Sequence, residues 1–250
     1  QIELKEFLDY KANQYEIIDF ITSDPIQIPH RFKQKEDVEI AAFLTASIAW
    51  GNRLSILKSA NKMIALMDDS PYDFIINHKK SDLSIFEGFV HRTFNATDLT
   101  FFVRSLQNIY KNHQGLENVL NSNKSSLQHT IHDFKSIFFE IDHPQRTLKH
   151  VSDPLKGSAA KRLNMFMRWM VRSNTKGVDF GIWKHHSPAQ LSIPLDVHTG
   201  NIARKLNLIQ RKPNDSKTLR ELDKKLRKFD PVDPVKYDYA LFGLGVFEKF

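Results

Sequence analysis

The chain contains no cysteine, and this absence removes several kinds of protein from consideration. Without cysteine there is no disulfide framework, no cysteine-ligated zinc site and no cysteine-ligated iron–sulfur cluster. Long apolar runs are missing too, and none approaches the ~20 residues that a membrane-spanning helix requires. No signal peptide is recognisable. We therefore expect a cytoplasmic protein with no membrane contact, no metal and no cofactor.

What the chain does contain is typical of a folded globular protein. Of its 250 residues, 41% are hydrophobic and 11% aromatic, enough for one large core or two smaller ones. The net charge of +7 is uneven, because residues 151–250 hold 19 Lys and Arg against 10 Asp and Glu, whereas residues 1–150 hold 17 against 19. The basic C-terminal part predicts a polyanion partner such as nucleic acid. A solvated basic surface without a ligand is the alternative.

Apolar residues recur at helical spacing along most of the chain, and sustained two-residue alternation is absent. This pattern predicts an all-α protein and makes a sheet-based fold unlikely. Asn52 is suited to cap one helix, and Asn95 with Asp98 resembles a capping box. The expected helices cover residues 36–49, 52–67, 99–110, 125–139, 158–173, 197–207, 215–229 and 233–247.

A lysine stands at the start of one expected helix. Gly157 permits a tight turn, and Lys161 follows four residues later, where free backbone amides bind phosphate well. An amine held there beside Arg162 is suited to attack a sugar carbon and form a Schiff base, which supports base loss and strand cleavage by elimination. A solvated lysine on a basic helix face is the commoner situation.

Asp196 is the best candidate for the carboxylate that this chemistry needs. It follows Pro194 and directly precedes the helix expected at 197–207. A carboxylate stabilises positive charge on the sugar or assists proton transfer. A plain N-cap explains the residue about equally well, and one side chain can fill both roles.

Two segments resemble the helix–hairpin–helix DNA glycosylase superfamily. Residues 157–161, Gly-Ser-Ala-Ala-Lys, are similar to its hairpin and catalytic lysine, and residues 194–198, Pro-Leu-Asp-Val-His, to its catalytic aspartate segment. Upstream, residues 38–67 resemble the early helix pair of that superfamily, whose junction, here residues 46–53, usually lies near the DNA. The whole chain also resembles a family of uncharacterised bacterial proteins.

The chain departs from the superfamily pattern at two points. Ala159 replaces the second hairpin glycine, and Lys161 and Asp196 lie further apart than is common. An insertion that contains residues 178–184 would account for the longer spacing. The long spacing and residues 161–166 are similar to the archaeal 8-oxoguanine glycosylases. That subfamily is therefore the nearest functional analogue.

The resemblance implies an all-α, two-lobed, glycosylase-like fold with a cleft between the lobes. Residues 1–250 would form one unit, with 30–140 mainly in the first lobe and 150–250 in the basic lobe. It implies a monomeric base-excision repair glycosylase with abasic-site lyase activity, which acts on double-stranded DNA and removes an oxidised purine such as 8-oxoguanine. Lys161 and Asp196 would be catalytic. Contacts with DNA are expected from Lys156, Gly157, Arg162, His198, Arg204, Lys205, Asn52 and Arg53, and the base pocket from Trp50, Trp169 and Trp183.

Other functions remain open. A helical nucleic-acid-binding protein on the same scaffold would lack the chemistry, and a glycosylase without lyase activity would use Asp196 to direct water and Lys161 only as a phosphate contact. The pairs His129/His132 and His185/His186 are weak metal candidates, because a third and a fourth ligand cannot be assigned.

Overall fold

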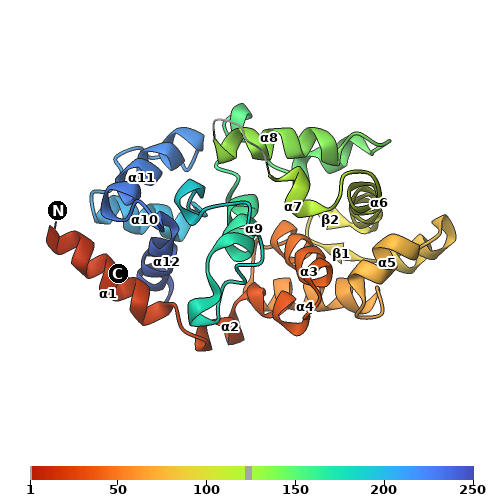
Figure 1. The fold of residues 1–250 in the computed structure, drawn as a ribbon, viewed down its shortest axis with the longest axis horizontal. Helices are drawn as coiled ribbons and strands as arrows, with labels where there is room; N and C mark the ends of the chain where they lie inside the picture. Colours follow the sequence, from red (N-terminus) through yellow and green to blue (C-terminus); the bar gives the residue numbers. More distant parts are fainter. Residues whose placement is uncertain (1, 122–125) are drawn as a thin grey trace. The chain divides into compact units, whose positions relative to one another are not determined.

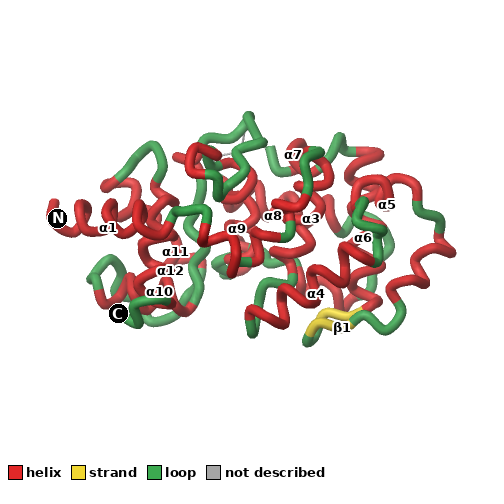
Figure 2. The backbone as a smooth tube through the Cα atoms, turned by 90° about the horizontal axis from the view of Figure 1, so that it is seen from below, coloured by secondary structure: helices red, strands yellow, loops and turns green. Residues whose placement is uncertain are grey.

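The computed structural model describes residues 2–121 and 126–250, and its regular structure is almost entirely helical (Figure 2). Within these residues the named strands are β1 (Val90–His91) and β2 (Phe94–Asn95), which pair as a short antiparallel hairpin. The prediction of an all-α chain is therefore confirmed.

The described residues form two compact units. Unit 1 comprises residues 2–22, 126–129 and 153–250, and unit 2 comprises residues 23–121 and 130–152. Helix α8 (Leu127–Phe138) consequently begins in unit 1 and continues in unit 2. Each unit is described by itself below.

Unit 1 combines the N-terminal helix of the chain with its C-terminal part (Figure 1). Its α-helices are α1 (Ile2–Tyr15), most of α2 (Asp19–Ser23), α9 (Lys161–Val171), α10 (Val197–Lys205), α11 (Ser216–Phe229) and α12 (Tyr237–Val246). Single 3₁₀ turns connect them: η5 (Pro154–Lys156), η6 (Asn174–Lys176), η7 (Pro188–Gln190) and η8 (Pro234–Lys236).

Helix α12 is the centre of unit 1, because its sequence is almost wholly apolar and it packs against both α1 and α10. Gly243 allows a close approach there: a Cβ added at this position would lie 2.1 Å from the ring of Tyr15. Burial of apolar side chains from α1, α10, α11 and α12 provides the main stabilisation of this unit. The core includes Leu8, Ala12, Ile193, Ile202, Ala203, Leu219, Leu222, Leu226, Leu241 and Leu244.

Unit 2 has a core rich in phenylalanine. Phe43, Phe102 and Phe138 contact one another with ring centroids 4.8–5.9 Å apart, at separations where aromatic pairs attract beyond their burial. Its elements are η1 (Pro25–Gln27), η2 (Pro29–Arg31), α3 (Lys35–Ser47), α4 (Arg53–Ala65), α5 (Pro71–Asn77), η3 (Lys80–Phe86), the β1–β2 hairpin, α6 (Ala96–Asn112), α7 (Leu116–Val119), η4 (Gln145–His150) and the remainder of α8.

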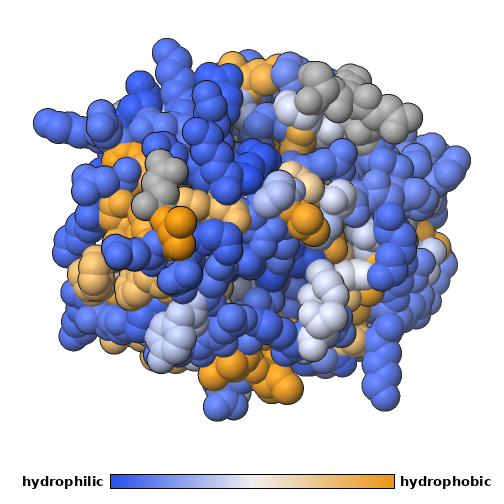
Figure 3. Space-filling view, turned by 60° about the vertical axis from the view of Figure 1, so that its left-hand side comes forward, coloured by the Kyte–Doolittle hydropathy of each residue, from blue (hydrophilic) through white to orange (hydrophobic). Residues whose placement is uncertain are grey.

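The face drawn in Figure 3 is mostly hydrophilic, with hydrophobic residues exposed in separate patches. No helix in the described part of the chain combines the length and the apolar character needed to cross a membrane.

Most helix boundaries fall close to those expected from sequence. The predicted caps are present: Asn52 accepts a hydrogen bond from the Ser55 amide at 3.3 Å, and Asn95 forms a capping box with Asp98. The helix expected over 233–247 is divided, because Pro234 opens the 3₁₀ turn η8 before α12 begins at Tyr237. Residue 125, the first of the expected helix 125–139, lies outside the described residues.

Candidate active site

A hairpin formed by residues 157–160 leads the chain into α9. Its first and last residues have left-handed backbone conformations. Gly157 has φ 96° and ψ −2°, and Ala160 has φ 45° and ψ 40°. Asp153 caps η5 by accepting a hydrogen bond from the Leu155 amide at 3.1 Å. The Ser216 amide donates to the Gly157 carbonyl at 3.0 Å, so the hairpin is fixed against the start of α11. These contacts determine where α9 begins, at Lys161.

Lys161 is the first residue of α9, as expected from the sequence. Ala160 provides no side-chain cap for this helix. The Nζ atom of Lys161 lies 3.7 Å from Sδ of Met165, one turn further along the helix. From Leu163 to Val171 the residues of α9 are buried, so Lys161 stands where the helix emerges from the core.

Asp196 caps α10 and faces Lys161 as well. Its Oδ1 accepts a hydrogen bond from the Thr199 amide at 2.9 Å, and its backbone carbonyl accepts one from Nδ2 of Asn214 at 2.8 Å. The other oxygen, Oδ2, lies 4.0 Å from Nζ of Lys161. The side chains are 29% exposed for Lys161 and 25% for Asp196, so both reach the surface. Two residues far apart in sequence thus form an accessible amine–carboxylate pair.

A second carboxylate, Asp238 in the first turn of α12, belongs to the same electrostatic environment. It is buried and forms an ion pair with Arg168, which lies seven residues after Lys161 on α9. Burial raises the pKa of Asp238 to about 6, Asp196 adds to the rise, and Arg168 and Lys161 oppose it. The charge of Asp238 is therefore coupled to the charges of the Lys161–Asp196 pair.

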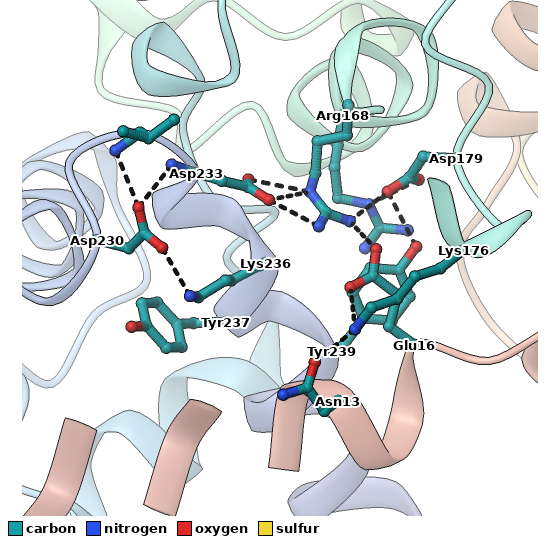
Figure 4. A network of polar contacts seen from close by, with 12 residues as sticks. Asn13, Glu16, Arg168, Lys176, Asp179, Asp230, Asp233, Lys236, Tyr237 and Tyr239 are labelled. Carbon is teal, nitrogen blue, oxygen red and sulfur yellow. Dashed lines mark hydrogen bonds and ion pairs between the residues drawn. The ribbon is translucent and has the colours of Figure 1, made fainter. Parts of the chain in front are cut away.

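A buried ionic network, which includes Arg168, Asp179 and Glu16, holds the C-terminal half of α9 (Figure 4). Asp179 accepts from Nε of Arg168 at 3.3 Å, from Nη1 of Arg172 at 2.6 Å and from the hydroxyl of Tyr239 at 3.0 Å. Arg172 also pairs with Glu16, beyond the end of α1, at 2.6 Å. The network connects α9 with α12 and with the chain that follows α1.

Sequence reasoning missed Asp238 and its partner Arg168. The signal was present, because Asp238 is the sole charged residue in α12, which is otherwise apolar or aromatic. A carboxylate in such a helix is buried only when a cation or several donors accompany it. The partner cannot be read from the sequence, since 70 residues separate the two.

The residues expected to contact DNA within unit 1 differ in the exposure and the hydrogen bonding of their side chains. Lys156, Gly157 and His198 are exposed, whereas Arg162 is half-buried, and this desolvation lowers the pKa of its guanidinium to about 10. Arg204 is engaged within the protein: its Nε donates to the Arg211 carbonyl at 2.8 Å. Lys205 donates to the Phe250 carbonyl at 2.9 Å. The roles of these residues in DNA binding stay predictions.

The residues of unit 2 that were expected to contact DNA or the target base lie in one segment, at the start of α4. Trp50 lies parallel to His150 with ring centroids 6.0 Å apart, and its ring meets His91 edge-on at 5.2 Å. Asn52 caps α4, and Arg53 forms an ion pair with Asp24 at 3.8 Å.

The two tryptophans expected to line a base pocket in unit 1 are buried. Trp169 is 0% exposed and Trp183 is 1% exposed. The Trp183 amide donates to the Met170 carbonyl at 3.0 Å, near the end of α9 opposite to Lys161. Trp183 also borders a surface hollow of about 520 Å³. Base stacking by either ring stays a prediction.

Among residues 2–121 and 126–250, no group of three or more His, Asp or Glu side chains is placed to hold a metal ion. In unit 1 the candidate site consists of the Lys161–Asp196 pair, the hairpin that precedes Lys161 and the buried ion pair of Arg168 with Asp238.

Comparison with known proteins shows the family of the chain. The model of a family described as protein of unknown function (DUF2400) matches residues 24–247, and the chain belongs to that family. No curated protein and no solved structure matches the chain.

Proposed function

We propose that this protein is a DNA glycosylase with abasic-site lyase activity, in which Lys161 is the nucleophile and Asp196 the assisting carboxylate. The single observation that carries the proposal is the accessible pair that these residues form, with Nζ and Oδ2 4.0 Å apart. The resemblance of residues 157–161 and 194–198 to the helix–hairpin–helix glycosylases supports the same assignment, and with it a glycosylase-like, two-lobed fold.

The pair suits Schiff-base chemistry. The Lys161 amine, once deprotonated, adds to C1′ of the target sugar as the bond from C1′ to the base breaks, and the base leaves with the bonding electrons and takes up a proton. Opening of the sugar ring gives an imine between C1′ and Nζ. Loss of a proton from C2′ then expels the 3′ phosphate by elimination. Asp196 is placed to stabilise the positive charge that develops on the sugar.

The surroundings of the pair suit a polyanionic substrate. The hairpin before α9 presents Lys156 and Gly157 at the surface, and α9 has no side-chain cap at its N-terminus. Uncapped amides and an exposed lysine favour a phosphate close to Nζ of Lys161. The preference for an oxidised purine rests on the resemblance to the archaeal 8-oxoguanine glycosylases, and double-stranded DNA is the proposed partner.

Borohydride trapping tests the proposal, because reduction converts the imine into a stable protein–DNA bond. Duplexes containing 8-oxoguanine or an abasic site are offered to the wild-type protein and to Lys161→Gln. We expect a covalent band with the wild type and none with the variant. Lys156→Gln is the matched control, since it removes an exposed lysine from the same hairpin and should keep the band at saturating protein.

The substitution Asp196→Asn tests the proposed role of Asp196 as the assisting carboxylate separately from its role as an N-cap. Asparagine is as good an N-cap as aspartate, so α10 should still form while the negative charge is lost. We expect trapping to slow by about 10²–10⁴-fold with little change in melting temperature. Binding to duplex DNA without any trapped band would instead support the non-catalytic nucleic-acid-binding protein.

A further inference from the structure

Unit 2 carries a group of arginines. The net charge of residues 1–150 is negative and does not reveal this group. Arg53, Arg92 and Arg146, here called the arginine cluster, belong to α4, the β1–β2 turn and η4. The segments that bear them are free of acidic residues over residues 40–67, 88–97 and 143–152. The acidic residues that give the first half its negative balance lie elsewhere in the sequence.

Contacts between the segments bring the cluster together. The Arg92 side chain lies over Gly51, where Nη1 is 2.8 Å from the position that a Cβ would take, and Arg53 follows two residues later. Nη2 of Arg146 donates to the carbonyl of Thr93, next to Arg92, at 3.0 Å. The Arg92 guanidinium therefore occupies space that is available because residue 51 is glycine.

Arg92 differs from the other two in its bonding. Arg53 pairs with Asp24 and Arg146 with the buried Asp98, at 3.8 and 3.3 Å. Arg92 is exposed and has neither a hydrogen bond nor an ion pair with any residue in the described ranges 2–121 and 126–250. Its charge is thus available to an outside anion.

The backbone at Arg92 is unfavourable for the residue that occupies it. Arg92 has φ 54° at the first position of a two-residue hairpin turn, where only this residue, and not Thr93, has positive φ. Turns of this kind favour glycine at that position. A long cationic side chain is therefore held at a position that local stability does not favour, as is common at functional sites.

We infer that the arginine cluster binds the phosphate backbone of nucleic acid, with Arg92 as its principal contact. The inference rests on the proposed function for the identity of the partner and adds a second phosphate-binding surface, in unit 2, to the hairpin of unit 1. Guanidinium groups bind phosphate oxygens through paired hydrogen bonds and do not lose their charge at neutral pH.

The experiment measures the affinity for an undamaged duplex by fluorescence anisotropy at several salt concentrations, with the full chain. Arg92→Gly removes the charge and relieves the turn, so its melting temperature should equal or exceed that of the wild type. We expect its affinity to fall severalfold and the slope of log affinity against log salt to decrease in magnitude by about one. Arg92→Lys should retain most of the affinity. Lys111→Gln, which removes an exposed charge from the last turn of α6, should change neither quantity.

The outcomes separate this inference from the proposed function. Unchanged affinity and salt slope in Arg92→Gly, with borohydride trapping intact, would overturn the inference and leave the glycosylase proposal standing. Reduced affinity in Arg92→Gly, with no trapping by the wild type, would support the phosphate-binding surface and remove the glycosylase. An equal loss in Lys111→Gln would also overturn the inference, because the effect would then follow net charge and not the cluster.

Discussion

Gly157 and Ala160 determine the position of Lys161, the proposed nucleophile, although neither carries a reactive group. Both have positive φ, and α9 begins at the residue after Ala160. Glycine adopts such a conformation without penalty, whereas alanine is disfavoured there by about 1–2 kcal/mol. The backbone conformation at residue 157 therefore suits its glycine, whereas the conformation at residue 160 does not suit its alanine.

This difference predicts opposite effects for two substitutions in the hairpin. A Cβ at Gly157 would meet no atom within 4 Å, so Gly157→Ala should lower the free energy of unfolding by about 1–2 kcal/mol through the backbone alone. Ala160→Gly should leave stability unchanged or raise it by up to about 1 kcal/mol. Urea unfolding of both variants checks this, and a gain from Gly157→Ala would contradict it.

Single residues also show which parts of the site were predictable. Asp196 was recognisable because a carboxylate after proline and before a helix suits an N-cap, and the cap is present. Lys161 was recognisable from its place at a helix start. Their 4.0 Å approach was not, since the path of the intervening loop follows from tertiary packing. Asp238 was missed because its partner Arg168 lies on another helix.

At the scale of elements, α9 connects the Lys161–Asp196 pair with the interior of unit 1. Lys161 begins the helix, and Arg168 and Arg172 follow toward its end, where both guanidinium groups contact Asp179. The side chain of Asp179 is 0% exposed. A buried carboxylate between two guanidinium groups fixes the rotation of the helix about its axis, and with it the direction in which Lys161 points.

Removal of the Asp179 carboxylate should strongly destabilise the protein. Asp179→Ala leaves two buried guanidinium groups short of a partner, and we expect a loss of about 3–5 kcal/mol in the free energy of unfolding. Asp69→Asn is the matched control, because the pair of Asp69 with Arg31 is exposed and should contribute less than about 1 kcal/mol. Thermal or urea unfolding measures both, and similar small losses would show that the network does not stabilise α9.

Helical periodicity predicted most elements, because an amphipathic helix repeats its apolar residues along one face. Helix α1 (Ile2–Tyr15) was not expected, because only Leu8 and Ala12 are buried along its 14 residues and its apolar period is correspondingly weak. The short helix α5 is only one or two turns long, too short for a clear period. The start of α12 is displaced from the expected residue 233 because the 3₁₀ turn η8, which Pro234 opens, comes before α12 begins at Tyr237.

At the scale of the whole molecule, charge was informative only in part. The excess of basic residues in the C-terminal half indicated a polyanion partner, and the Lys161–Asp196 pair lies in that half. Arg53 was expected to contact DNA, but Arg92 and Arg146 were not recognised, because the charge count averaged them with acidic residues that lie in other segments. Only the contacts of Arg92 with Gly51 and of Arg146 with Thr93 reveal the arginine cluster.

The central claim is that one lysine forms the covalent bond with DNA, and locating that bond tests the claim most directly. The intact protein is trapped with borohydride on an abasic duplex and digested, and the adduct is located by mass spectrometry. The account predicts that the DNA-derived fragment is attached to Nζ of Lys161. Attachment to another residue, such as Lys156 or Lys184, would contradict the assignment of Lys161 as the nucleophile.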